Sequence, residues 1–242
     1  MKNTPESRKQ NGRTTAEAPS IIVFDVNETL IDIESMGGFF ENIFGDRKVL
    51  REWFNQLILY SNVTTLAGYY ETFFTLGEGV FEMLGTIYGL SITPADCEEL
   101  RSKMASMPAH EDAGKGLRLL KEAGFRLMTL TNSPPSETGS PLDRGQLAHF
   151  FEHQFSVDRI HKFKPAPEVY HLVAESLNVP PSAICLVAAH TWDTLGAQAV
   201  GCCAGLVTRA GNAPLPIRGL PQPQVVAPDL ERLAKQMIAM WR

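Results

Sequence analysis

The sequence predicts an α/β protein, a parallel sheet with helices on both faces, that carries an inserted subdomain made of helices. Two observations predict it. Short apolar runs typical of buried strands alternate with helical patterns over most of the chain. Residues 33–110 break this alternation, because they contain helical patterns and no strand-like run. We expect a core from residues 21–32 and 111–242 and a helical cap from residues 33–110.

The core elements follow from apolar runs and helix-capping signals. Residues 21–24, Ile-Ile-Val-Phe, are a continuous apolar run typical of a strand buried on both faces. Further strands are predicted at residues 125–130, 154–157, 184–188 and 203–207. Helices are predicted at residues 113–123, 165–177, 191–200 and 228–241. Asp112 is the predicted N-cap of the first of these helices, and residues 213–223 are predicted as a proline-rich loop.

The inserted segment contains four helical patterns, at residues 36–44, 48–60, 69–88 and 94–107. Thr93 is the predicted N-cap of the last one, with Pro94 at its first helical position. We interpret Phe73, Phe74 and Phe81 as cap core. Inserts of this kind close over the carboxyl edge of a sheet, where α/β folds bind their ligands.

The composition limits the partners and the location. The 242 residues are 44% hydrophobic and 20% charged, with a formal net charge of −5, which excludes a disordered, collagen-like or coiled-coil chain. There is neither a broad basic surface nor an apolar run of the roughly 18 residues that cross a bilayer, so we expect no nucleic-acid or membrane partner. The four cysteines form no C-x-x-C pair and suit a reducing cytoplasm. Residues 1–20 lack the apolar core of a secretory signal and are predicted to be a disordered leader.

Polar side chains follow the first four predicted strands at or near the points where they end. They are Asp25, Asn27 and Thr29, then Thr131, Asn132 and Ser133, then Lys164, and finally His190 and Asp193. Any one of them alone is ordinary loop chemistry, such as a turn aspartate or a surface lysine. Their joint occurrence at one edge of a parallel sheet predicts an active site beneath the cap.

Four segments resemble the motifs of the haloacid dehalogenase superfamily. They are Phe-Asp-Val-Asn-Glu-Thr-Leu at 24–30, Leu-Thr-Asn-Ser at 130–133, Lys-Pro at 164–165 and Trp-Asp at 192–193. The compact cap, and the segment Lys164-Pro-x-x-x-x-Tyr170, look most like the type II L-2-haloacid dehalogenases. The resemblance covers about residues 20–225. It implies a Rossmann-like haloacid dehalogenase core with a helical cap, and the hydrolysis of short (S)-2-haloacids.

Two missing acids favour carbon–halogen cleavage over phosphate-ester hydrolysis. The metal-dependent phosphatases of this superfamily carry a general acid where this chain has Asn27, which cannot donate a proton as an acid does. Ala189 stands where those relatives have a metal-binding acid, and only Asp193 remains, although Mg²⁺ prefers several oxygen ligands. Because a halide leaves without a proton, we expect neither a metal nor another cofactor.

The resemblance assigns a role to each site residue. Asp25 attacks the carbon that bears the halogen and forms an ester, which water then cleaves at the carboxyl carbon of Asp25. Lys164 keeps Asp25 ionised, and Asp193 orients or activates the water. Thr29, Thr131 and Asn132 are expected to form hydrogen bonds with the nucleophile or the substrate. The backbone N–H groups of Val26 and Asn27, with Thr131, are expected to bind the substrate carboxylate. Tyr170 is expected to pack near Lys164.

Several positions depart from the enzymes that the chain resembles. Phe54 stands where many of them have an arginine that binds substrate and halide. Arg51 lies three residues earlier on roughly the same helical face, where it either substitutes for that arginine or is a solvated surface residue. His190 replaces an asparagine, Ala188 a serine and Glu28 a glycine. We hypothesise that His190 positions water or contacts the halide. With Phe54 in the substrate site, these changes either shift the substrate range, for example towards small substrates such as haloacetates, or mark a chain with little dehalogenase activity.

The expected partners are a small halogenated carboxylic acid and water. The resemblance also allows a homodimer, because dimers are common among the enzymes that the chain resembles, but the sequence leaves the oligomeric state open. Two other interpretations stay open. One is a magnesium-dependent phosphatase of the same superfamily that uses Asp25 and Asp193. The other is a degenerate member with little activity, which is kept for binding.

Overall fold

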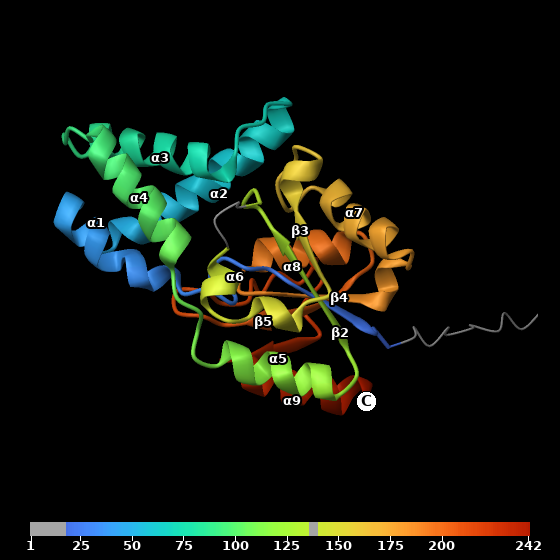
Figure 1. The fold of residues 1–242 in the computed structure, drawn as a ribbon. Helices are drawn as coiled ribbons and strands as arrows, with labels where there is room; N and C mark the ends of the chain where they lie inside the picture. The colour runs from blue at the N-terminus through green and yellow to red at the C-terminus, as the bar shows by residue number, and fades with distance from the viewer. Residues whose placement is uncertain (1–17, 136–139) are drawn as a thin grey trace, which may run out of the picture.

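The computed structural model describes residues 18–135 and 140–242, so most of the predicted leader lies outside the described residues. The described residues form a six-stranded parallel sheet in the order β3-β2-β1-β4-β5-β6. The strands are β1 Ile21–Phe24, β2 Arg126–Thr131, β3 His153–Ser156, β4 Ile184–Ala188, β5 Cys203–Val207 and β6 Val225–Ala227. The predicted α/β class with a parallel sheet is confirmed (Figure 1).

The central strand β1 explains why Asp25 lies deep in the protein. All four residues of β1 are buried, and the strand pairs with β2 on one side and β4 on the other. Asp25 is the next residue, and its N–H donates to Val187 O of β4 at 2.9 Å. Because all six strands run parallel, their carboxyl ends meet at the edge where Asp25 lies. The strand β6 was missed, since three residues between a proline-rich loop and a helix are too few to show a pattern.

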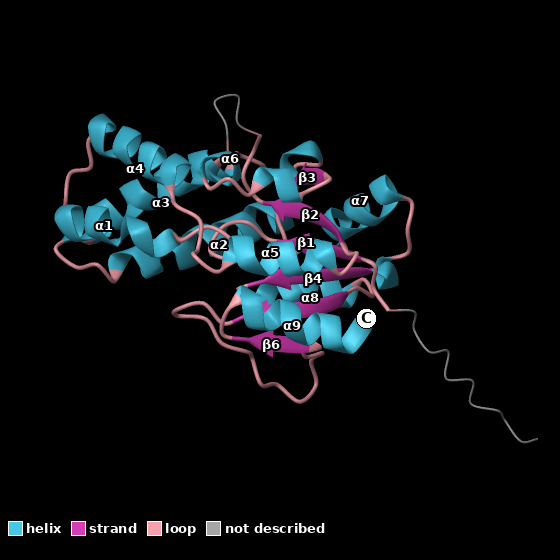
Figure 2. Ribbon diagram, turned by 60° about the horizontal axis from the view of Figure 1, so that its bottom comes forward, coloured by secondary structure: helices cyan, strands magenta, loops and turns pink. Residues whose placement is uncertain are grey.

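Helices cover both faces of the sheet. The pair α5 Ala113–Glu122 and α9 Leu230–Trp241 lies side by side on one face, with α7 Pro167–Leu177 and α8 Thr191–Ala199 on the other (Figure 2). Asp112 occupies the N-cap position of α5 as predicted, but its side chain caps no α5 N–H. Its carboxylate instead accepts hydrogen bonds from Arg209 and from the backbone N–H of Leu230. These partners are distant in sequence, and they take the place of the N–H groups at the start of α5.

The segment between β1 and α5 is helical. It contains η1 Ile33–Met36, α1 Gly37–Phe44, α2 Val49–Ala67, α3 Phe73–Ile87 and α4 Pro94–Ser106, which lie together to one side of the sheet (Figure 1). The helix α2 is longer than predicted and ends at Gly68, whose φ of 79° favours glycine. Thr93 caps α4 as predicted. Phe73 and Phe81 are buried and Phe74 is partly buried, as expected for cap core.

The chain crosses from the sheet to the helical segment and back through two stretches of backbone that lie side by side. Ile31 bridges Ala109, and the N–H of Asp32 donates to Pro108 O at 2.8 Å. The division into core and cap at this crossing is our proposal. Short elements complete the fold: α6 Pro141–Arg144, η2 Ala148–Phe150, η3 Val157–Arg159 and η4 Pro181–Ala183. None of the helices in the described ranges is long and apolar enough to span a membrane.

Candidate active site

Asp25 is a buried carboxylate whose two oxygens are both held. Its Oδ1 accepts a hydrogen bond from Lys164 Nζ at 2.8 Å, and its Oδ2 accepts one from the Thr29 hydroxyl at 2.6 Å. The Thr29 hydroxyl in turn accepts from the backbone N–H of Ala189 at 2.8 Å, which fixes its direction. Burial raises the pKa of Asp25, but the charges of Lys164 and His190 outweigh it and hold this pKa well below its usual range. The carboxylate therefore stays ionised.

Lys164 is the cation that two buried carboxylates share. Its Nζ lies 2.8 Å from Asp25 Oδ1 and 2.6 Å from Asp193 Oδ2, and it donates to Leu130 O at 3.1 Å. Its three donors are thus satisfied. Burial lowers the pKa of Lys164, but the two carboxylates raise it above its ordinary value. The side chain is 1% exposed and remains charged.

Asp193 is fully occupied in holding Lys164. One of its oxygens bonds Lys164, and the other accepts from the Tyr170 hydroxyl at 2.7 Å. The close approach of Tyr170 depends on Gly196, because a Cβ at that position would lie 2.5 Å from the Tyr170 hydroxyl oxygen. A carboxylate whose two oxygens are both bonded and buried is poorly placed to take a proton from water.

His190 brings a second titratable group to Asp25. Its Nε2 lies 2.6 Å from Glu28 Oε2, while its Nδ1 lies 3.5 Å from Asp25 Oδ2 and has no hydrogen-bond partner among the described residues. The ring stacks on Trp192, with centroids 5.0 Å apart, and faces Phe54 at 5.5 Å. Burial lowers the pKa of His190, but Asp25 and Glu28 raise it to about 9. The imidazole is therefore protonated at neutral pH while Asp25 is ionised.

Glu28 is a residue of the site whose contacts sequence analysis missed. Its backbone φ is 65°, a left-handed conformation that favours glycine, so the glutamate is held there against its backbone preference. The conformation directs a 2% exposed carboxylate inward. One oxygen bonds His190, and the other accepts from Arg51 and from Asn212 Nδ2, the latter at 2.7 Å. The signal in the sequence was an acid in place of a glycine, together with a histidine in place of an asparagine.

The other predicted residues lie at the same edge. Asn27 Nδ2 donates to the Ser133 hydroxyl at 3.1 Å, and Asn132 Oδ1 accepts from the backbone N–H of Lys164 at 3.1 Å. Asn132 is thus directed at the backbone next to Lys164. Thr131 Oγ1 accepts from the backbone N–H of Ser133. The structure also brings Val26, Phe54 and Tyr170 to this edge, all of them buried.

Two cavities adjoin residues next to Asp25 in sequence or space, although Asp25 itself lines neither of them. One of about 240 Å³ is lined on the core side by Val26, Asn27 and Thr131. The other, of about 250 Å³, is lined by residues that include Glu28, Arg51, Phe54, His190 and Trp192. In residues 18–135 and 140–242 there is no group of three or more His, Cys, Asp or Glu side chains that could hold a metal ion. The cation at the two site carboxylates is the Lys164 ammonium.

Comparisons with known proteins point to one family. Residues 19–201 match the haloacid dehalogenase-like hydrolases. The chain is 27% identical to (S)-2-haloacid dehalogenase from Pseudomonas sp. (strain YL) over 193 residues, 79% of this chain and 83% of that enzyme. It is 31% identical to (S)-2-haloacid dehalogenase 1 from Pseudomonas sp. (strain CBS-3) over 181 residues, 74% of this chain and 80% of that enzyme. The solved L-2-haloacid dehalogenase from Xanthobacter autotrophicus superposes with a TM-score of 0.82 at 25% identity, covering 92% of this chain and 99% of that one.

The shared lysine leads to a prediction about stability. Replacing Lys164 by methionine leaves Asp25 and Asp193 buried without their cation, so the free energy of unfolding at pH 7 should fall by about 3–5 kcal/mol. The loss should shrink as the pH is lowered towards 5, because protonation removes the uncompensated charge. Urea unfolding at several pH values measures both effects.

Lys162→Met is the matched control. Lys162 is exposed and pairs with Glu168 at the surface, so its replacement should change stability by less than about 1 kcal/mol. Equal losses for the two variants would contradict the shared role of Lys164.

Proposed function

The chain belongs to the haloacid dehalogenase-like hydrolases, as its motifs predicted, and from this premise we propose that it hydrolyses short (S)-2-haloacids to 2-hydroxy acids without a metal. The observation that carries the proposal is the state of Asp25: a buried, ionised carboxylate whose counter-charge is the Lys164 ammonium. The (S)-2-haloacid dehalogenases to which the chain is similar support the substrate class. Asn27, in place of an acid, suits a leaving group that needs no proton.

In the first step, one oxygen of Asp25 attacks carbon 2 of the substrate from the side opposite the halogen. A carbon–oxygen bond forms, and the halide leaves with the bonding electron pair. Lys164 keeps the nucleophile ionised and Thr29 fixes its direction. We propose that the backbone N–H groups of Val26 and Asn27, with Thr131, bind the substrate carboxylate from the side of the 240 Å³ cavity.

In the second step, water attacks the carboxyl carbon of the Asp25 ester, and we assign its activation to His190 instead of Asp193. Both oxygens of Asp193 are engaged, whereas His190 Nδ1 points at Asp25 without a partner of its own among the described residues. Glu28 holds the proton on Nε2, which leaves Nδ1 as the basic nitrogen once the ring is neutral. Asp193, Tyr170 and Asn132 are then positioning residues for Lys164.

The protons balance in this scheme. His190 is an imidazolium while Asp25 is ionised, and the ester removes one of the two negative charges that raise the pKa of His190. The ring then releases its proton to solvent, which is the proton that the overall hydrolysis produces. Next His190 takes one proton from the attacking water, and the hydroxide adds to the ester carbon. The alkoxide leaves and receives the second proton of the water, which restores ionised Asp25 and protonated His190.

Two further parts of the proposal concern the setting of the enzyme. Cys97, Cys185, Cys202 and Cys203 are all free thiols, which supports a reducing, cytoplasmic location. A homodimer would rest on exposed apolar side chains of α2, of which Leu59, Tyr60, Val63 and Leu66 are the largest.

A halide-release screen tests the proposed function. Chloro-, bromo- and fluoroacetate and both 2-chloropropionate enantiomers are incubated with the protein, with and without a chelator. We expect halide release from haloacetates and the (S)-enantiomer, unchanged by the chelator. Asp25→Asn should lower the rate by a factor of about 10³ or more, because the nucleophile is lost.

A model phosphate ester is the companion substrate in this screen. Chelator-sensitive phosphate release without halide release would support the magnesium-dependent phosphatase and contradict the proposal. Neither product from the wild-type protein would support a degenerate member.

The assignment of His190 predicts that its replacement stalls the enzyme at the ester. In His190→Ala, the first turnover should still release about one halide per active site, while ester hydrolysis slows by a factor of about 10²–10⁴, the usual contribution of a general base. Stopped-flow halide detection measures the first turnover. Intact-protein mass spectrometry should find the protein heavier by the carboxyalkyl group of the substrate, as expected for the ester at Asp25.

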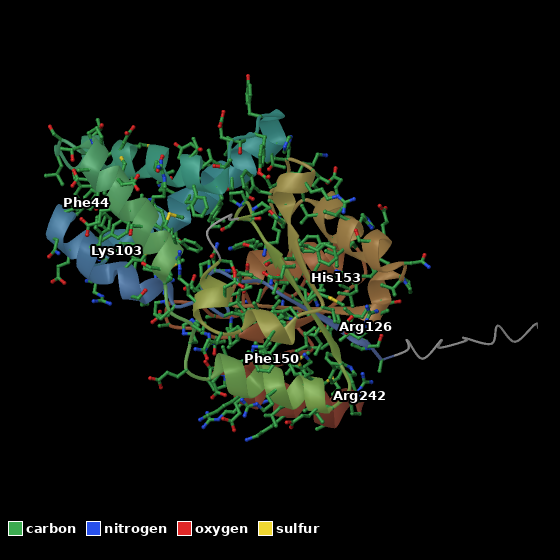
Figure 3. The ribbon with its side chains drawn as sticks, viewed as in Figure 1. Phe44, Lys103, Arg126, Phe150, His153 and Arg242 are labelled. Carbon is green, nitrogen blue, oxygen red and sulfur yellow. The ribbon has the colours of Figure 1, made fainter. Side chains whose placement is uncertain are left out.

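His153→Ala is the control, because this exposed histidine, labelled in Figure 3, begins β3 and so lies at the amino ends of the strands, opposite the edge where Asp25 lies. It should leave both steps unchanged. A His190→Ala variant that slows the halide burst, with no ester accumulating, would show instead that His190 acts on the substrate or the halide.

A further inference from the structure

We propose that Arg51, on the cap helix α2, is a positioning residue that makes water activation by His190 depend on contact between cap and core. The inference rests on the proposed function. It starts from a continuous series of contacts: Arg51 bonds Glu28, Glu28 bonds His190, and His190 faces Asp25. The series therefore connects a helix of the cap to the nucleophile.

The contacts of Arg51 join three segments of the chain. One guanidinium nitrogen bonds Glu28 in the loop after β1, and the other donates to Ala210 O at 2.7 Å and pairs with Glu34. Its plane lies against Gly211, where a Cβ would be 3.3 Å from the guanidinium carbon. The side chain is 27% exposed, while Glu28 behind it is 2% exposed. Arg51 thus covers the Glu28 carboxylate from the cap side.

This position lets Arg51 control the charge that His190 experiences. Asp25 and Glu28 face the imidazole directly, Arg51 lies behind Glu28, and Lys164 with Asp193 lies behind Asp25. When Asp25 becomes an ester, Glu28 is the remaining carboxylate in contact with His190. The positive charge of Arg51 offsets the charge of Glu28, so the ring loses its proton at a lower pH than it would without Arg51. A neutral ring is the form that can accept a proton from water.

The same geometry argues against a direct role of Arg51 on the substrate. Its donors are engaged by Glu28, Glu34 and Ala210 O, whereas the position next to His190 is filled by the ring of Phe54. Arg51 is therefore no replacement for the arginine that the sequence lacks at position 54. Its effect reaches the reacting atoms through Glu28 and His190.

The first test measures the His190 titration directly and needs no turnover. Asp25→Asn removes the charge of the nucleophile, as the ester does, and NMR then follows the His190 ring in this background. Adding Arg51→Gln should raise the pKa of His190 by about one unit, the size expected when a partly screened charge one carboxylate away is removed. Arg51→Lys keeps the charge and should recover most of the shift.

Glu34→Gln in the same Asp25→Asn background is the matched control. It removes the outer partner of Arg51 but leaves the pair of Arg51 and Glu28, so the pKa of His190 should move far less. Equal pKa values of His190 with and without Arg51 would overturn the inference. This result is independent of whether the protein releases halide, so it is separate from a failure of the proposed function.

The second test uses the pH dependence of the two steps in otherwise wild-type protein. Arg51→Gln should leave the first-turnover halide burst unchanged and move the rise of ester hydrolysis with pH about one unit upward. At pH 7 hydrolysis should be up to about tenfold slower, and near pH 9 the rates should converge. A rate lowered equally at every pH would mean a merely structural role, and a slower burst would mean contact with the substrate. Either result would refute the inference.

Discussion

The site depends on one ammonium group placed between two buried carboxylates. Without Lys164, the buried carboxylates Asp25 and Asp193 would lose the cation that they share, and the pKa of Asp193, which has no other cation in contact among the described residues, would rise further. With Lys164 present, Asp25 stays ionised, which is the state that the proposed nucleophile needs. The cost is that Asp193 is committed to Lys164 and Tyr170. This engagement is the reason for the proposal that water activation comes from His190.

The loop after β1 carries Glu28, the hydrogen-bond partner of His190, three positions after Asp25. Glu28 has a left-handed backbone conformation, and its carboxylate bonds His190 at the end of β4 and Arg51 on α2. In the proposed mechanism, this loop supplies the attacking oxygen for the first step and orients the base for the second. Under the proposed division into core and cap, Arg51 extends that arrangement to the cap.

Much of this could be predicted from the sequence, since it follows from local patterns. The apolar runs gave five of the six strands, and the rule that parallel strands end at one edge brought Asp25, Lys164 and Asp193 together. The rest depended on contacts that no local pattern encodes. Glu28 and His190 are 162 residues apart, and Glu28 and Asn212 are 184 apart. The same reason applies to Asp112, whose carboxylate bonds Arg209, 97 residues away, instead of an N–H of its own helix, and to Asp193, which bonds Tyr170, 23 residues away.

The central claim is that Asp25 itself carries the substrate between the two steps. A single turnover in ¹⁸O-water, with enzyme in excess over a 2-haloacid, tests it most directly, because water attacks the carboxyl carbon of the ester and not the substrate carbon. We predict that mass spectrometry of the peptide containing Asp25 shows ¹⁸O in its carboxylate, while the 2-hydroxy acid carries none. Label found only in the hydroxyl group of the product would mean that water displaces the halide directly, and would contradict the account.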